Sequence, residues 1–154
     1  MSNHPALKHL ALGEGKSVPL GKVGLSFKAG ITVGSRYTVA ELSLPAGSAN
    51  ALHRHPCEET MYVLEGEFEM VGEGDDRRLA GPGCVMHVPA GAAHGFINVG
   101  KTTGRLLMVS SVEQEPYFDD LAVAMVTAKD DPEAVVKVRA RHGVESVGPV
   151  ARVR

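Results

Sequence analysis

The chain has 154 residues, a formal net charge of −2 and two cysteines. This length fits one domain with a single core, and the mild charge argues against a nucleic-acid surface, which needs a basic face. Two cysteines are too few for a disulfide framework, and free thiols are typical of a reducing compartment. The N-terminus has no apolar run of signal-peptide length, and the longest aliphatic stretch, 121–126, is too short to span a bilayer. We therefore expect a cytoplasmic protein that binds neither nucleic acid nor membrane.

Gly and Pro residues divide the chain, up to about residue 104, into short alternating runs rich in β-branched side chains. These runs predict strands at 35–44, 60–64, 67–71, 84–88, 95–99 and 106–110. Short strands separated by turns at regular intervals are typical of an all-β sandwich or barrel.

The last part of the chain has a helical pattern instead. Four apolar residues recur with the spacing of one helix face: Phe118, Leu121, Ala122 and Met125. Asp131 before Pro132 is typical of a helix start, and Gly143 is typical of a helix stop. We therefore predict two short helices within about 115–143. They pack on a barrel of about 20–112, in a single domain that takes in residues 1–154.

A histidine pair marks the most informative stretch, 47–66. His53 and His55 are two residues apart, so on a strand both imidazoles lie on one face and can share a metal ion. Glu59 follows a strand-breaking proline and starts an alternation of inward apolar residues, as the lining of a barrel requires. Glu58 has the opposite parity and is expected to point outward.

A second stretch, 83–98, supplies a further donor. A strand ends at Pro89, a turn follows at Gly91, and His94 opens the next strand. In a barrel, an imidazole at that point can face back across the interior toward the other donors. The candidate metal ligands are therefore His53, His55, Glu59 and His94.

Both stretches match known motifs at every fixed position. The first, G-x5-H-x-H-x3-E-x6-G, begins at Gly47, and the second, G-x5-P-x-G-x2-H-x3-N, begins at Gly83. The chain thus resembles the cupin superfamily, and its flanking segments resemble single-domain bacterial cupins that are often compared with quercetin dioxygenases. This resemblance implies a double-stranded β-helix, the cupin or jelly-roll barrel, with a short C-terminal helical extension. It also implies that the four candidate residues bind the metal and that the chain forms a homodimer.

The lining of the substrate pocket is predicted from strand parity, and many of these residues would serve equally as core. The candidate substrate-pocket residues are Met61, His87, Phe96 and Met108, with Val63, Met86 and Leu107 as further residues of the expected parity. His87 either faces inward beside the ligands or outward as a surface residue. Cys57 lies beside the ligands in sequence, but its place in the turn argues against metal binding. Asn98 is expected to make structural hydrogen bonds.

Three neutral imidazoles and one carboxylate suit one divalent transition metal (Fe, Mn, Ni, Co, Cu or Zn) rather than Ca or Mg. Four protein ligands leave a position open for a small-molecule substrate, and Glu59 can also act as a catalytic base. The resemblance favours a metal-dependent dioxygenase that acts on a small enol, diketone or flavonol-like substrate. The alternatives are a redox-neutral isomerase, cyclase or decarboxylase, and a non-enzymatic cupin that binds a small molecule.

Overall fold

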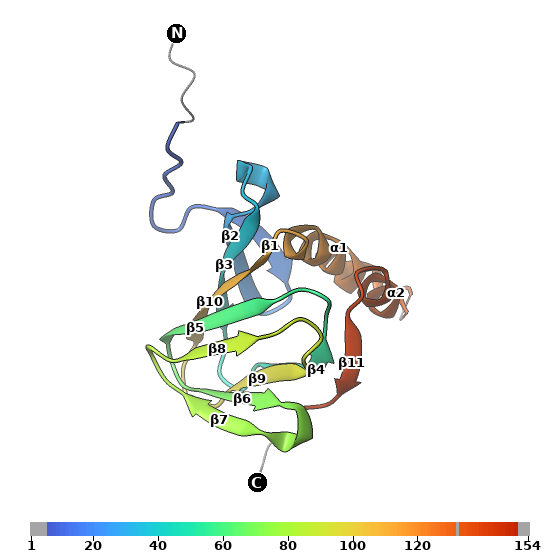
Figure 1. The fold of residues 1–154 in the computed structure, drawn as a ribbon. Helices are drawn as coiled ribbons and strands as arrows, with labels where there is room; N and C mark the ends of the chain where they lie inside the picture. The colour runs from blue at the N-terminus through green and yellow to red at the C-terminus, as the bar shows by residue number, and fades with distance from the viewer. Residues whose placement is uncertain (1–5, 132, 151–154) are drawn as a thin grey trace.

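The computed structural model describes residues 6–131 and 133–150, whose strands form two facing antiparallel sheets (Figure 1). In spatial order, the six-stranded sheet contains β1 (Lys16–Leu20), β2 (Val23–Ala29), β3 (Tyr37–Leu44), β10 (Gly104–Ser111), β5 (Glu59–Glu65) and β8 (Val85–Val88). The five-stranded sheet contains β11 (Glu145–Gly148), β4 (Ala49–Arg54), β9 (His94–Asn98), β6 (Phe68–Gly72) and β7 (Arg77–Ala80). This architecture confirms the all-β, jelly-roll prediction.

The strands form because their side chains alternate between the core and the outside. In β3 every second residue is buried along the whole strand, as expected of a strand with one face on the core. The same alternation runs along β5, where Glu59, Met61 and Val63 point inward. The inward residues of both sheets meet in one core, in which Phe68 and Leu106 have no exposed surface.

All six predicted strands are present, with ends shifted by a few residues. The predicted barrel limits of about 20 and 112 leave out two strands, because β1 begins at Lys16 and β11 follows the helical tail. The six predicted ranges also do not include β2, β4 or β7. β7 has a single buried residue and β11 has none, so they lack the apolar alternation from which a strand is predicted.

The predicted tail of about 115–143 forms two helices. They are α1 (Gln114–Thr127) and α2 (Ala134–Arg141). Gly143 ends α2 with a φ of 69°, the left-handed conformation that glycine adopts most readily. The Asp131 carboxylate accepts a hydrogen bond from the Glu133 backbone N–H, and the predicted first-turn Pro132 lies outside the described residues. Among the described residues, no helix is both long and apolar enough to cross a membrane.

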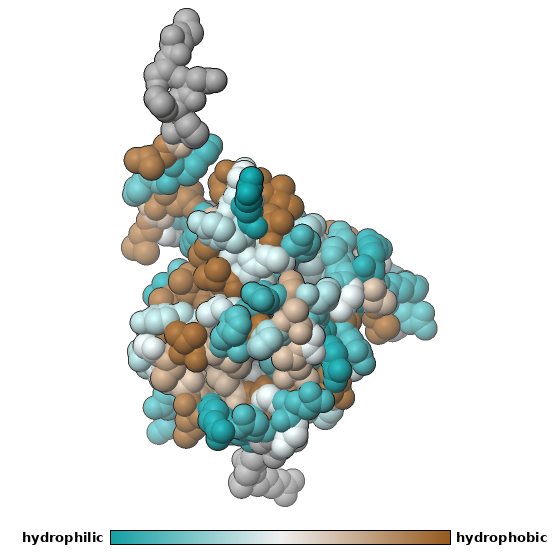
Figure 2. Space-filling view, viewed as in Figure 1, coloured by the Kyte–Doolittle hydropathy of each residue, from teal (hydrophilic) through white to brown (hydrophobic). Residues whose placement is uncertain are grey.

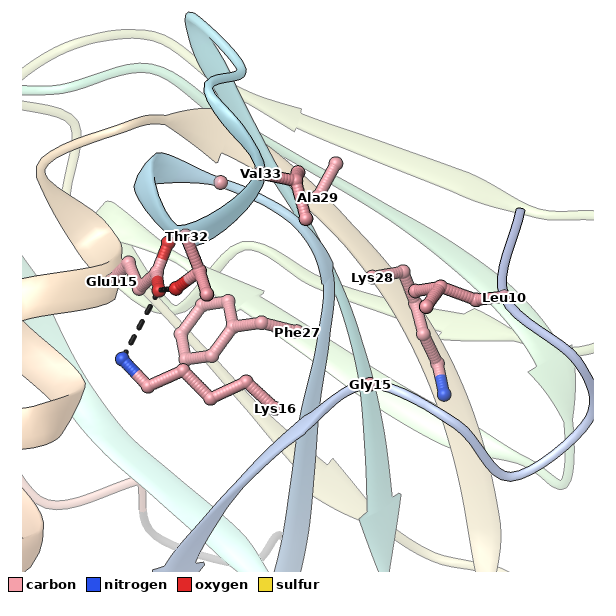
Figure 3. A pocket seen from close by; sticks show the side chains of 10 residues that line it. Leu10, Gly15, Lys16, Phe27, Lys28, Ala29, Thr32, Val33 and Glu115 are labelled. Atoms are coloured by element: carbon pink, nitrogen blue, oxygen red, sulfur yellow. Dashed lines mark hydrogen bonds and ion pairs between the residues drawn. The ribbon is translucent and has the colours of Figure 1, made fainter. Parts of the chain in front are cut away.

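A buried carboxylate at the start of α1 ties this helix to the N-terminal part of the barrel. Glu115 is 2% exposed. Its Oε1 accepts hydrogen bonds from Lys16 Nζ, at 3.0 Å, and from the Thr32 hydroxyl in the 3-10 helix η1 (Ile31–Val33), as Figure 3 shows. A Cβ on Gly30 would clash with the Glu115 carboxylate, so this close approach favours glycine there. The start of α1 is thereby fixed against β1.

Asn98 joins three segments at the end of the barrel opposite the start of β9. Its side chain is fully buried. Its Nδ2 donates to the carbonyls of Leu44 and Thr102, at 2.8 and 2.9 Å, and its Oδ1 accepts from the Gly100 N–H. The sequence-based expectation of a structural hydrogen-bonding residue is confirmed.

We predict that Asn98→Ala lowers the free energy of unfolding by about 2–4 kcal/mol, because it leaves the buried Leu44 carbonyl without a donor and removes the hydrogen bonds to Thr102 and Gly100. The measurement is urea unfolding followed by circular dichroism. Asn50→Ala is the matched control, since no side-chain hydrogen bond is recorded for Asn50 among the described residues. Equal effects of the two substitutions would contradict the role given to Asn98.

Candidate metal centre

The four candidate ligands gather where several strands begin or end at one end of the barrel. His53 lies near the end of β4 and pairs directly with His94, the first residue of the neighbouring strand β9. Glu59 is the first residue of β5, on the facing sheet. His55 lies between β4 and β5, and is therefore the only one of the four that no strand holds among the described residues.

The structure brings the donor atoms of these residues together. One nitrogen from each of His53, His55 and His94 lies within 4.8 Å of the other two. The Glu59 carboxylate faces this group, with Oε2 3.6 Å from His55 Nε2 and Oε1 3.8 Å from His94 Nε2. These separations are too long for hydrogen bonds, yet they are suited to donors that share one ion.

Each imidazole is oriented through its other ring nitrogen. The Nδ1 atoms of His53, His55 and His94 lie 2.8, 2.9 and 3.0 Å from the carbonyl oxygens of Ala51, Cys57 and Ala92. A carbonyl can only accept, so each Nδ1 carries the proton and each Nε2 keeps its lone pair.

The chemistry of this donor set fits a metal ion. The Nε2 atoms of His55 and His94 are buried and have no hydrogen-bond partner among the described residues. Buried polar atoms nearly always have a partner, and metal-binding histidines commonly donate their remaining N–H to a carbonyl. Three imidazoles of fixed tautomer beside a carboxylate therefore form a donor set that suits a divalent transition metal.

Burial changes the pKa values of these three rings. It lowers the pKa of His53 to about 4, with a further contribution from the neighbouring His94, and it also lowers the pKa of His94. Burial acts in the same direction on His55, but the contact with Cys57 and the nearby negative charge of Glu59 outweigh it and raise the pKa of His55. His53 and His94 are therefore neutral near pH 7, as metal binding requires.

A cavity of about 350 Å³ opens beside the ligands, between the edge strands β7 and β8 of the two sheets. His94 is the one candidate ligand in its lining. The apolar wall is formed by Met70, Ala80, Met86 and Ala93, and the rim carries Asp76 and Arg78. This volume suits a small molecule.

The predicted substrate-pocket residues lie partly elsewhere. Met61, Phe96 and Met108 are buried in the core and do not line this cavity. His87 lies at its rim but is exposed, with Nδ1 3.0 Å from the Thr60 hydroxyl. Of the further parity-based residues, Met86 lines the cavity. Leu107 has the outward parity, because it lies between the buried residues Leu106 and Met108 of β10.

Two neighbours of the ligands behave as the sequence suggests. Glu58 is exposed, whereas Glu59 is buried. The Cys57 sulfur lies 3.2 Å from Nδ1 of His55, on the side of the ring away from the metal-facing Nε2. Sequence parity alone missed Met70, although it follows from the inward alternation at the start of β6, and it missed Ala80 because β7 lacks such an alternation.

Comparison with known proteins shows a likeness to one family over the central part of the chain. Residues 40–110, which include all four candidate ligands, match the Cupin domain family model. This part of the chain is therefore similar to a cupin domain. The dimethylsulfoniopropionate lyase DddQ of Ruegeria pomeroyi is 41% identical over 51 residues, which are 33% of this chain. That match covers 25% of the length of the lyase.

Solved structures show the same fold. The polyketide cyclase RemF from Streptomyces resistomycificus superimposes with a TM-score of 0.62 at 24% identity, over 70% of this chain and 80% of RemF. An RmlC-like cupin from Shewanella frigidimarina gives 0.61 at 19% identity, over 72% and 96% of the two chains. A predicted oxalate decarboxylase from Thermotoga maritima gives 0.54 at 26% identity, over 59% and 81%.

We predict that the double substitution His53→Ala and His94→Ala abolishes metal binding and leaves the barrel folded, because the two rings contribute donors at strand ends. Metal content after dialysis and circular dichroism measure the two effects. His87→Ala is the control and should keep the metal. Metal retained by the double variant would refute the ligand assignment.

We also predict that the metal-free protein loses stability as the pH falls from about 6.5 to about 4. His53 stays neutral in the folded state down to about pH 4 but takes up a proton near pH 6.5 when unfolded, so acid favours unfolding in this window. The raised pKa of His55 has the opposite effect on stability: it makes the folded state lose stability as the pH rises, and only above about pH 6.5. Urea unfolding at several pH values should show a weaker dependence in His53→Gln, and an unchanged dependence would contradict this account.

Proposed function

We propose that this protein is a metal-dependent enzyme that acts on a small oxygenated substrate. The observation that carries the proposal is the pair of buried Nε2 atoms of His55 and His94, which have no hydrogen-bond partner among the described residues. Each unsatisfied buried acceptor would cost about 1–3 kcal/mol in stability. A shared metal ion would bind both Nε2 atoms and remove that cost.

The residues that would hold the ion are His53, His55, Glu59 and His94. A divalent transition metal (Fe, Mn, Ni, Co, Cu or Zn) supplies Lewis acidity toward a substrate oxygen. The chain keeps His53 and His94 neutral and orients all three imidazoles, and Glu59 offers a buried carboxylate oxygen that can accept a proton from the substrate. The apolar cavity beside His94 would hold the substrate and limit the access of water.

Two reaction classes use this arrangement differently. The first is the dioxygenase reaction on an enol, diketone or flavonol-like substrate, in which O₂ reacts with the deprotonated substrate. The second is a redox-neutral reaction, such as an elimination, isomerisation, cyclisation or decarboxylation, that starts with the same proton transfer. The redox-neutral class gains support from the 41% identity with a dimethylsulfoniopropionate lyase. A single proton-accepting carboxylate beside the metal is sufficient for it.

Metal analysis of the protein, purified without added metal, tests the proposal together with two assays. For the dioxygenase, we expect Fe, Mn, Ni or Co and O₂ uptake with a flavonol or β-diketone. For the redox-neutral enzyme, we expect turnover without O₂, followed by nuclear magnetic resonance with dimethylsulfoniopropionate and simple β-keto acids as first substrates. Glu59→Gln should lower either activity at least about 100-fold, as expected for the loss of a general base. Bound metal with ligand binding but no turnover would identify a binding protein instead.

We also propose that the chain forms a homodimer. The N-terminal segment projects from the barrel (Figure 1) and displays apolar side chains (Figure 2), with Leu7 and Leu12 fully exposed. The outer face of the six-stranded sheet carries the partly exposed Tyr62 and Val109 on neighbouring strands. A second copy of the chain would cover these surfaces with matching apolar ones.

We predict a dimer in solution at micromolar concentration, measured by sedimentation equilibrium. Tyr62→Glu should shift the mass toward the monomer, because it places a charge in the apolar face. The control is Val123→Glu, which changes an exposed apolar residue on α1. A monomeric wild-type chain would rule out the dimer.

A further inference from the structure

The ring of His55 has contacts that the other two imidazoles lack. Its Nδ1 lies 2.9 Å from the Cys57 carbonyl and 3.2 Å from the Cys57 sulfur. The contacts recorded for Nδ1 of His53 and of His94 are each with a backbone carbonyl. The Cys57 side chain therefore makes a second contact with this one ring.

The Cys57 sulfur is itself held by the helical tail. Gln114, the first residue of α1, is 4% exposed, and its Nε2 donates to Cys57 Sγ at 3.2 Å. The Ser110 hydroxyl approaches the same sulfur at 3.8 Å. The position of Gln114 is restricted, because the neighbouring Glu115 accepts hydrogen bonds from Lys16 and Thr32. A chain of contacts thus runs from the anchored helix through Gln114 and Cys57 to His55.

These contacts support His55, the candidate ligand that strand pairing does not hold. His53 and His94 lie on paired strands, whereas His55 lies in the connection between β4 and β5. The Gly91 N–H holds the backbone of His55 by donating to its carbonyl at 2.8 Å, but that bond does not set the rotation of the ring. The contacts at Nδ1 do, and partners of this kind fix the orientation and basicity of metal-bound histidines.

We propose that Gln114 and Cys57 are positioning residues that hold the His55 ring for the metal, so that the helical tail is part of the metal centre. The inference rests on the metal site proposed above. It predicts that Cys57 itself does not bind the ion, because its sulfur lies on the Nδ1 side of His55. Gln114 lies outside the residues 40–110 that match the cupin-domain model.

Binding of Co²⁺ to the purified metal-free protein tests the proposal. The dissociation constant, measured by chelator competition, should rise about 10- to 100-fold in Cys57→Ala and in Gln114→Ala, the range found when second partners of metal-bound histidines are lost. Gln114→Glu keeps the shape of the side chain but removes the donor, and should weaken binding similarly. Cys57→Ser keeps an acceptor and should bind nearly as tightly as the wild type.

A double-variant cycle separates this role from a general loss of structure. The double substitution of Cys57 and Gln114 by Ala should cost no more than the stronger single substitution, because both act through one contact. Cys84→Ala is the matched control, since Cys84 is the other free cysteine and is exposed; it should leave affinity unchanged. Thermal unfolding of each metal-free variant identifies any that fail to fold.

Spectroscopy of the Co²⁺ form addresses the ring directly. Paramagnetically shifted proton spectra should show an exchangeable Nδ1–H signal for each bound imidazole, of which only the His55 signal moves in Cys57→Ala. Unchanged affinity and an unmoved signal in Cys57→Ala and Gln114→Glu would overturn the inference, as would a sulfur-to-cobalt charge-transfer band. A wild-type chain that binds no Co²⁺ would overturn the proposed metal site, and this inference with it.

Discussion

The orientation of three imidazoles is the constraint on which the rest of the site depends. Each ring is held through Nδ1 by a carbonyl only two residues away along the chain, those of Ala51, Cys57 and Ala92. The local backbone therefore sets the direction in which each Nε2 points, and the fold of the barrel brings the strand ends together. This arrangement explains how short motifs of fixed spacing can position the donors of the candidate metal centre within a larger fold.

The same contrast between local orientation and overall fold explains which parts of the site could be predicted from the sequence. The clustering of the four candidate ligands was predictable because spacing and parity set which way each side chain faces near a strand end. The lining of the substrate pocket could not be predicted in this way, since parity shows which face of a strand a side chain is on but not how far it lies from the open edge of the barrel. Met61 and Met108 face inward as expected but are sealed between the sheets, whereas Met70 lies near the open edge. On α1, helical spacing likewise included Met125 in the packed face, yet this residue is 40% exposed.

The tail shows how an extension becomes part of a site. Its first turn reaches the barrel through Gln114 and Glu115, which face different partners: one contacts the sulfur beside His55, and the other is bound to Lys16 and Thr32. No periodic pattern in the sequence marks either residue as special, because each acts through a single contact with a distant segment. Such pairings depend on the folded arrangement and become visible only in three dimensions.

The strand β11 adds a further consequence, in the order in which the chain is made. It pairs with β4, with Ser146 opposite His53, and it follows every other described element in sequence. While the chain emerges from the ribosome, β4 therefore remains an edge strand open to unwanted pairing until the tail has been synthesised. The metal centre would thus reach its final rigidity late, and an ion that binds early would meet one of its histidines on an unprotected edge.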